Sequence, residues 1–119
     1  MYNGEAMNHH PKPLVFMGDS VSALREFSPV ARRRAGQQLY RVQCGGDADD
    51  WKPIPGVGPG VREIRVKDEA GIYRVFYVAK FLEAVYLLHC FQKKSQKTSQ
   101  SDMETGIRRF KELLEERKS

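Results

Sequence analysis

The sequence predicts an α+β domain with the element order β-α-α-β-β-β-α, in which the helices pack on one face of a small antiparallel-rich sheet. Two observations predict it. Apolar residues recur at helical spacing in two segments, residues 28–43 and 101–117, whereas alternating or continuous apolar runs typical of strands fill residues 61–91. Since the strand segments follow one another without an intervening helix, hairpin-connected antiparallel strands are favoured over parallel ones.

The chain begins its predicted fold with a short strand and a short helix. Residues 14–17, LVFM, form the apolar run expected to be the first strand. Asp19 or Ser20 can cap the helix that follows. The apolar positions of that helix are Val21, Leu24 and Phe27.

A second helix begins at Ser28-Pro29, a hydroxyl cap followed by proline at the first helical position. Its apolar positions recur at intervals that define one helical face: Ala31, Ala35, Leu39 and Val42. Gly45-Gly46 ends the helix. Residues 45–60 are rich in Gly, Pro and Asp and are expected to form a loop.

Three strands are predicted next. Residues 61–67 alternate, with Ile64 and Val66 on one side and charged residues on the other. Residues 68–71, DEAG, form the turn to a second strand over residues 72–80. The third, residues 84–91, is apolar at nearly every position, as a central strand covered on both faces should be.

The last element is a helix with balanced charge. Ser101-Asp102-Met103-Glu104 has the form of a capping box. Met103, Ile107, Phe110 and Leu114 follow at helical spacing, and residues 102–118 carry five basic and five acidic side chains.

Length and composition limit the architecture and the cellular setting. At 119 residues and 40% hydrophobic content the chain fits one domain, residues 13–119, preceded by a flexible leader, residues 1–12. No apolar run reaches the roughly 18 residues of a membrane span, and no secretory signal is visible, so we expect a cytoplasmic protein. Cys44 and Cys90 suggest reduced thiols rather than a disulfide framework. The histidines and cysteines lack the spacing of metal ligands, and neither a metal nor a cofactor is expected.

The charge distribution favours a polyanionic partner. The net charge is +5 and the pI is near 9.4. Basic residues lie on the predicted strands or directly after them. Placing several cations on a strand costs free energy unless an anion binds to them. RNA is the anion that this pattern suggests.

Cleavage of RNA without a metal requires a base for the ribose 2′-hydroxyl and cations around the phosphorus that gains negative charge. Arginine supplies permanent planar donors, and the pKa of a lysine falls when other cations crowd it. Arg65 and Arg74 lie on strands joined by a short turn, so they can face each other across the sheet.

The candidate catalytic residues are Glu63, Arg65, Arg74, His89 and Lys94, and the candidate RNA-binding residues are Lys52, Arg62, Lys67, Lys93 and Lys97. Each has a structural reading as well. The arginines and lysines can be solvated surface side chains, and a histidine inside an apolar strand is often a core residue. His89 is nonetheless suited to acid–base work by its ordinary pKa.

The chain resembles a known family in two connected motifs. GPGVREIRVKDEAGIYRVFYVAK and VYLLHCFQKKSQKTS, followed by a helix, resemble the phage-derived branch of the RelE/HigB toxins in the RelE/ParE superfamily. The resemblance extends over roughly residues 13–117. It implies a toxin of a type II toxin–antitoxin system that cleaves mRNA on translating ribosomes without a metal. It also implies a cognate helix-turn-helix antitoxin as partner.

By this resemblance Arg65 and Arg74 match phosphate-binding or transition-state positions, and Lys93 or Lys94 matches a further cation. The sequence departs from the pattern at Glu63, where the best-known members carry a basic residue. It departs again in having no tyrosine after Tyr86.

These departures leave the mechanism open. Glu63 could act as a base, orient Arg65 or mark weakened cleavage, and Glu63, His89 and Lys94 are all candidates for the general base. Two other functions also remain: a ParE-like toxin that binds DNA gyrase without nuclease activity, and an inactive phage remnant that only binds its antitoxin.

Overall fold

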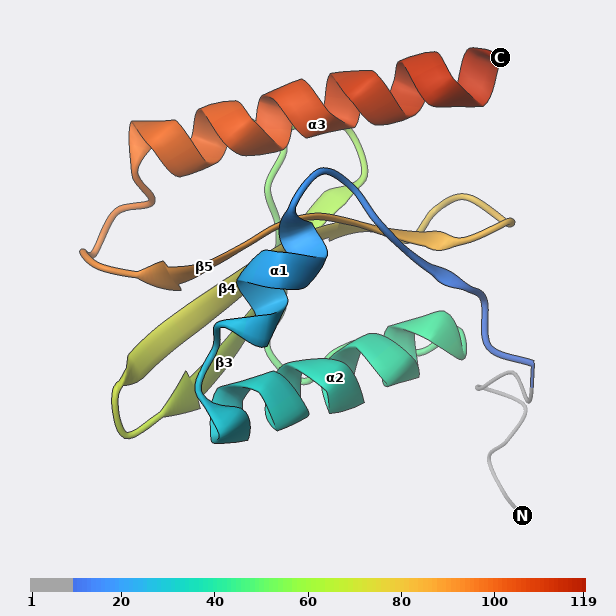
Figure 1. The fold of residues 1–119 in the computed structure, drawn as a ribbon. Coiled ribbons are helices and arrows are strands. Elements are labelled where there is room, and N and C mark those ends of the chain that lie inside the picture. The colour runs from blue at the N-terminus through green and yellow to red at the C-terminus, as the bar shows by residue number, and fades with distance from the viewer. Residues whose placement is uncertain (1–9) are drawn as a thin grey trace.

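The computed structural model describes residues 10–119, which form one mixed five-stranded sheet and three helices (Figure 1). The elements in chain order are β1 (Leu14–Phe16), α1 (Ser20–Arg25), α2 (Pro29–Gln43), β2 (Trp51–Pro53), β3 (Val61–Asp68), β4 (Gly71–Val78), β5 (Val85–Lys93) and α3 (Gln100–Lys118). The strand order in the sheet is β1-β5-β4-β3-β2. Only β1 and β5 run parallel; the other neighbours are antiparallel. The predicted α+β class is therefore confirmed.

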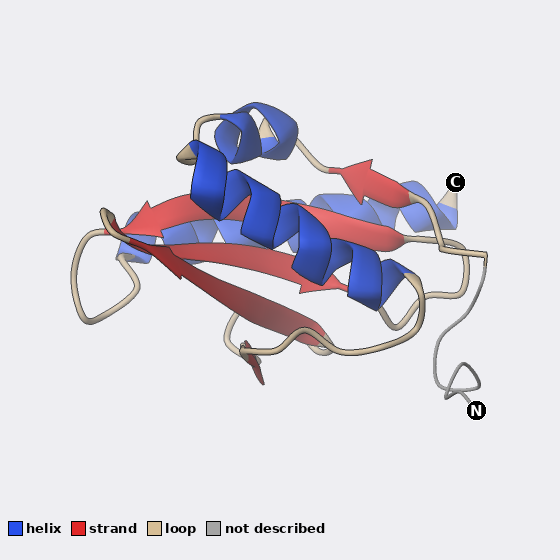
Figure 2. Ribbon diagram, turned by 90° about the horizontal axis from the view of Figure 1, so that it is seen from below, coloured by secondary structure: helices blue, strands red, loops and turns tan. Residues whose placement is uncertain are grey.

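The predicted position of all helices on one face of the sheet is wrong. α2 covers one face and α3 covers the other, as Figures 1 and 2 show. The reason lies in β4, which buries Val75 and Tyr77 toward α2 and Phe76 and Val78 toward α3. A strand that is apolar on both faces needs cover on both.

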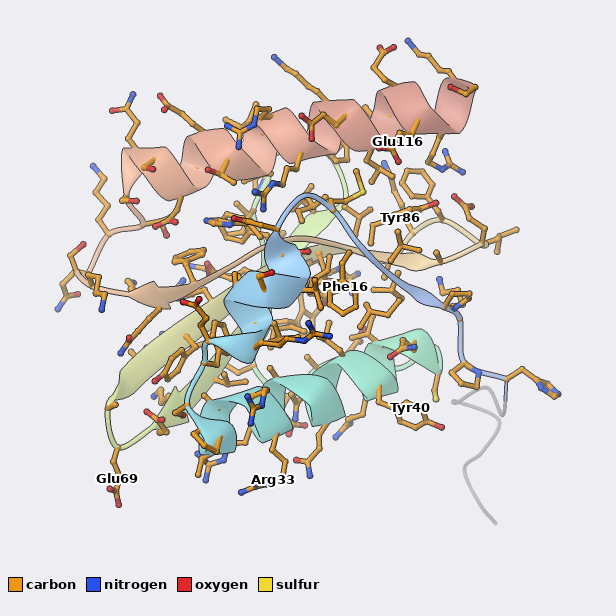
Figure 3. The ribbon with its side chains drawn as sticks, viewed as in Figure 1. Phe16, Arg33, Tyr40, Glu69, Tyr86 and Glu116 are labelled. Carbon is orange, nitrogen blue, oxygen red and sulfur yellow. The ribbon has the colours of Figure 1, made fainter. Side chains whose placement is uncertain are left out.

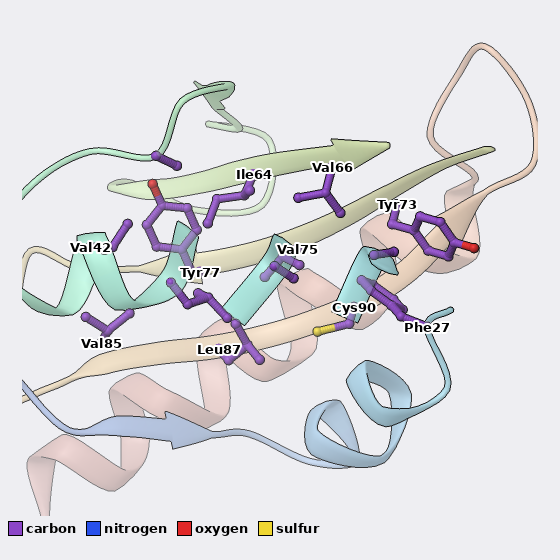
Figure 4. Close-up of a cluster of buried hydrophobic side chains, with 14 residues drawn as sticks. Phe27, Val42, Ile64, Val66, Tyr73, Val75, Tyr77, Val85, Leu87 and Cys90 are labelled. Atoms are coloured by element: carbon purple, nitrogen blue, oxygen red, sulfur yellow. The ribbon is translucent and has the colours of Figure 1, made fainter. Parts of the chain in front are cut away.

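The core on the α2 side confirms the predicted second helix. Ala31, Ala35, Leu39 and Val42 are all buried against the sheet. Ser28 caps the helix by accepting a hydrogen bond from the Ala31 amide at 3.0 Å. Figure 4 shows how the side chains of β3, β4 and β5 fill the space beneath this helix.

The last helix, α3, differs from its prediction in two details, its first residue and its buried face. The helix begins at Gln100, and its cap is Ser99, whose hydroxyl accepts from the Asp102 amide, so the capping box expected at Ser101 is wrong. Leu113 is fully buried, whereas Leu114 is 36% exposed. With Phe110 and Gly106, Leu113 forms the buried stripe, because these residues recur at intervals of three and four.

Two segments differ from their predictions, the strand β2 and the residues before β1. The short strand β2 pairs Trp51 with Ile64, but three residues ending in proline carry little strand signal. The expected leader falls mainly on residues 1–9, which lie outside the described residues. Lys12, by contrast, belongs to the fold, because its ammonium donates to the carbonyls of Ala79 and Phe81 at 2.8 and 2.9 Å.

No helix within residues 10–119 combines the length and the apolar character needed to cross a bilayer.

Candidate functional site

Arg65 and Arg74 lie directly opposite each other on β3 and β4, as predicted. Strand alternation puts both on the face of the sheet that α3 covers, because Phe76 and Val78 of β4 lie in the core on that side. On β5 the same alternation adds Lys93, two residues from the Phe91 that pairs with Arg74. We call this part of the sheet, with Lys52, Glu63, Arg65, Arg74 and Lys93, the basic face.

The Arg74 side chain is buried beneath the basic face. It is 2% exposed and forms an ion pair with the equally buried carboxylate of Glu63. The ammonium of Lys52, which is exposed, lies 3.8 Å from the same Glu63 oxygen. Among the described residues, the second Glu63 oxygen and the Arg74 Nε have no hydrogen-bond partner. The expected role of Glu63 in orienting Arg65 is therefore not found; Glu63 orients Arg74 instead.

Arg65 is the arginine that solvent can reach. Its side chain is 35% exposed, and its Nε lies 3.1 Å from Oδ2 of Asp50. It lines a shallow hollow of about 360 Å³ together with Gly71, Ile72, Lys93 and Lys94. We call this hollow the sheet groove. Here Arg65, Lys93 and Lys94 lie around one hollow that a ligand can enter.

The environment of Lys93 lowers the pKa of its ammonium below the ordinary value. Partial burial lowers the pKa of its ammonium, and the positive charge of Arg74 lowers it further, while Glu63 acts in the opposite direction. Lys52 and Arg65 add smaller lowering effects. The sequence resemblance left Lys93 and Lys94 as alternatives for one cation. The fold distinguishes them, because Lys93 is partly buried and Lys94 is exposed.

Lys94 leaves the strand and is exposed at the rim of the sheet groove, where its ammonium lies 3.3 Å from the Gln92 side-chain oxygen. Lys97 lies in the loop beyond and is also exposed. Its carbonyl accepts a hydrogen bond from Ser95. The sheet groove therefore contains Lys93 and Lys94 but not Lys97.

His89 is on the same side of the sheet but lies under α3, outside the sheet groove. Its Nε2 is 2.7 Å from Oδ1 of Asp102 in the first turn of α3. Its ring stacks on Phe91 with centroids 5.0 Å apart. This contact joins the start of α3 to β5, which fits the structural reading of His89.

The remaining candidates are divided between the two faces. Arg62 lies on the α2 side, with its guanidinium 4.0 Å from the ring centre of Trp51 and 3.2 Å from Asp47. Lys67 is exposed near the end of β3, on the same side as Arg65 by alternation. Lys67 can thus extend the basic face, whereas Arg62 cannot.

No group of three or more His, Cys, Asp or Glu side chains in residues 10–119 is arranged to hold a metal ion. Cys44 and Cys90 are both buried free thiols. Burial raises the pKa of Cys90 to about 12, so this thiol is poorly suited to nucleophilic chemistry.

Two features of the site were missed in the sequence. Asp50 neutralises Arg65, and the buried Glu63–Arg74 pair anchors the basic face from below. The acidic run over residues 47–50 was a visible signal for the first, because three of its carboxylates find arginines on α2 and β3. The second had no local signal, since the pair is diagonal across two strands.

The fold and this site describe a small α+β protein with a cationic groove suited to a polyanion. Among known protein families, the model of the phage derived protein Gp49-like family (DUF891) matches residues 22–111 of the chain. The chain belongs to this phage-derived family, which is of the RelE-related toxin type. Membership fits a toxin of a toxin–antitoxin system and implies an antitoxin partner. No curated protein matches the chain.

Proposed function

We propose that this protein is the toxin of a type II toxin–antitoxin system and cleaves mRNA on translating ribosomes through the sheet groove. The observation that supports this most is that Arg65, which lies opposite Arg74 in the sheet, lines one hollow with Lys93 and Lys94. A groove with several cations and a solvent-accessible arginine fits a phosphate of single-stranded RNA.

In this proposal Arg65 binds the phosphate that is cut. Its guanidinium is exposed and can exchange the Asp50 carboxylate for phosphate oxygens, because exposed ion pairs contribute little free energy. Arg74 does not touch RNA. Its buried charge, offset in part by Glu63, lowers the pKa of Lys93 from behind the surface.

Lys93 is our choice for the group that accepts the proton. In its neutral form, Nζ takes the proton of the ribose 2′-hydroxyl as that oxygen attacks the adjacent phosphorus. The bond from phosphorus to the 5′-oxygen breaks, and the departing oxygen takes a proton from solvent. The products are a 2′,3′-cyclic phosphate and a 5′-hydroxyl, and Arg65 and Lys94 offset the negative charge that develops on phosphorus. Of the three candidates that the sequence offered for the base, Glu63 is buried in its ion pair, His89 is bound to Asp102, and Lys94 is exposed at the rim of the sheet groove.

A gyrase-directed toxin is the second candidate. The burial of Arg74 favours it, because this removes one guanidinium from contact with RNA. The absence of a tyrosine after Tyr86 favours it as well. Cleavage of mRNA separates the two proposals.

The decisive experiment is primer extension on cellular mRNA after induced expression of the wild-type chain. We expect discrete cuts that Arg65→Ala abolishes, with growth restored. Arg62→Ala is the matched control: it removes an arginine on the same strand that is also paired with an aspartate, but on the opposite face. Intact mRNA with DNA damage would instead identify gyrase as the target, and no toxicity from the folded wild-type chain would indicate an inactive remnant.

A further inference from the structure

Arg65 lines a second hollow besides the sheet groove. This hollow has a volume of about 430 Å³ and lies between α2 and the end of β3. We call it the helix groove. The residues that line it with Arg65 include Arg34, Gln37, Gln38, Asp49, Asp50 and Lys67. Arg65 is thus common to a groove on the α3 side and a groove that reaches α2.

The edge of the sheet between the two grooves is open. β2 pairs only with Arg62–Ile64 of β3, and the Arg65 amide donates to the Asp50 carbonyl at 2.9 Å. From Val66 to Asp68, no strand within residues 10–119 pairs with this edge. The Lys67 carbonyl on the edge instead accepts a hydrogen bond from the Arg34 guanidinium. An extended chain can cross here without displacing a strand.

The helix beyond this edge carries unbalanced positive charge. α2 contains four arginines and no acidic residue, whereas α3 contains five basic and five acidic residues. Arg33 and Tyr40 extend outward from α2 into solvent (Figure 3). Mixed charges like those of α3 are typical of an ordinary solvated helix. The excess of positive charge on α2 instead attracts an anion.

We infer that an RNA strand held at Arg65 continues over the open edge of β3 into the helix groove, so that α2 binds nucleotides that flank the cut phosphate. The inference rests on the proposed function and extends its site. Arg34 is the phosphate contact in the helix groove, and Gln37 and Gln38 supply hydrogen bonds to sugar or base. The ligand is single-stranded RNA longer than the sheet groove alone can hold.

The two carboxylates of the helix groove are compatible with this path because each is already paired. Asp49 lies 3.0 Å from both Arg41 and the Gln38 amide nitrogen, and Asp50 is paired with Arg65. Both carboxylates are at least half exposed. An RNA phosphate replaces Asp50 at Arg65, and the released carboxylate is solvated at small cost.

The test compares two adjacent arginines of α2. Arg34→Gln removes a charge that lines the helix groove, and Arg33→Gln removes the same charge from an exposed position outside it. Binding is measured by fluorescence anisotropy with fully 2′-O-methylated RNA, which lacks the attacking hydroxyl and is not cut. Two lengths are used: a trinucleotide, and an RNA of about twelve nucleotides, within the usual site size of single-strand binders.

We expect Arg34→Gln to weaken binding of the longer RNA several-fold and to reduce its salt-dependence slope by about 0.7, the value of one phosphate contact. Binding of the trinucleotide should not change, and Arg33→Gln should have neither effect. Equal effects of the two substitutions would reduce the result to bulk charge and overturn the inference. Equal loss for both RNA lengths would overturn it too, because Arg34 would then act by holding the β3 edge.

A second pair of variants keeps the test valid if Arg34→Gln does not fold. Gln37→Lys adds a cation to the helix groove and should tighten binding of the longer RNA only. Glu112→Gln changes the net charge by the same amount on exposed α3 and should not. No gain from Gln37→Lys would count against the path. If Arg65→Ala leaves all RNA binding unchanged, the proposed function itself fails, whereas binding that needs Arg65 but neither position on α2 rejects only this inference.

Discussion

Glu63 and Arg74 form a buried ion pair beneath the basic face, and each side chain is no more than 2% exposed. The pair is diagonal across β3 and β4, since Glu63 lies opposite Phe76 and Arg74 lies opposite Arg65. Glu63, where the RelE/HigB resemblance implies a basic residue, therefore neutralises Arg74, which that resemblance assigns to the phosphate or the transition state. This makes Arg74 a fixed internal charge and leaves contact with the ligand to Arg65 and the lysines.

Glu63→Ala should strongly destabilise the fold. It leaves the Arg74 guanidinium buried without a counter-charge, and breaking a buried pair in this way costs about 3–5 kcal/mol. The free energy of unfolding, measured by urea denaturation, provides the check.

The double variant Glu63→Leu/Arg74→Met is the control for this effect. It replaces the pair with apolar side chains and should recover much of the lost stability, because neither charge is then left alone. A single variant within about 1 kcal/mol of the wild type would mean that Arg74 finds solvent in the folded state.

Lys93→Arg should remove the activity that depends on the neutral amine. The pKa of Lys93 lies below its ordinary value of 10.5 because of burial and Arg74, so the neutral fraction and the cleavage rate should increase as pH rises toward that pKa. An arginine keeps the positive charge but cannot give up its proton. RNA affinity should therefore be kept while the rate falls at least about a hundredfold and loses its rise with pH.

Lys94→Arg is the matched control for Lys93→Arg, because the two lysines are adjacent and line the same groove. It should keep both the rate and the pH profile. Single-turnover cleavage of a ribosome-bound message over pH 6–9 provides the measurement, and an unchanged pH profile in Lys93→Arg would assign the proton transfer to another group.

Asp50→Asn should increase the affinity for RNA. The substitution removes the carboxylate that occupies the Arg65 guanidinium in the free protein, so a phosphate no longer has to displace it. An exposed pair of this kind is worth roughly 0.2–1 kcal/mol, which corresponds to an affinity gain of up to about fivefold.

Asp47→Asn is the control for Asp50→Asn. It frees Arg62 on the opposite face and changes the net charge equally, but it should give a smaller gain. The dissociation constants of both variants for one RNA at one salt concentration decide the matter. Equal gains would show that only the total charge matters.

The ion pair between Glu83 and Arg117 should stabilise the protein at neutral pH and lose this effect in acid. Hydrogen bonds from Arg117, and then from Tyr86, lower the pKa of Glu83 from 4.5 to about 2. Because the folded pKa lies below the unfolded one, the stabilisation is complete above pH 4.5 and disappears as pH falls toward 2.

The wild-type chain should therefore melt above Glu83→Gln at pH 7, and the difference should shrink between pH 5 and pH 2. Glu112→Gln, which removes an exposed carboxylate with no ion pair among the described residues, is the control for charge loss. Thermal melts across this range provide the check. A difference that grows in acid would contradict the assigned pairing.

Local patterns predicted much of this fold. The helical face of α2 and its Ser28 cap follow from spacing and proline position, and the alternation of β3 follows from charged residues between Ile64 and Val66. The β3–β4 turn brought Arg65 opposite Arg74, because a short turn fixes which residues face each other. These features depend on residues close together in the chain.

Other features depend on residues far apart, and the sequence did not predict them. The pattern over residues 84–91 indicated cover on both faces of β5, yet which helix covers each face depended on the packing of the whole chain. α3 is capped by Ser99 rather than Ser101, and it buries Phe110 and Leu113 against the sheet.

The sequence by itself determined the α+β class, the excess of positive charge and the pairing of two arginines across a hairpin, since composition and short-range periodicity contain that information. The tertiary structure decided which cations meet solvent. It buried Arg74 with Glu63, half-buried Lys93 while exposing Lys94, and bound His89 to Asp102. Exposure, ion pairing and the pKa of a side chain depend on neighbours that only the folded chain brings into contact.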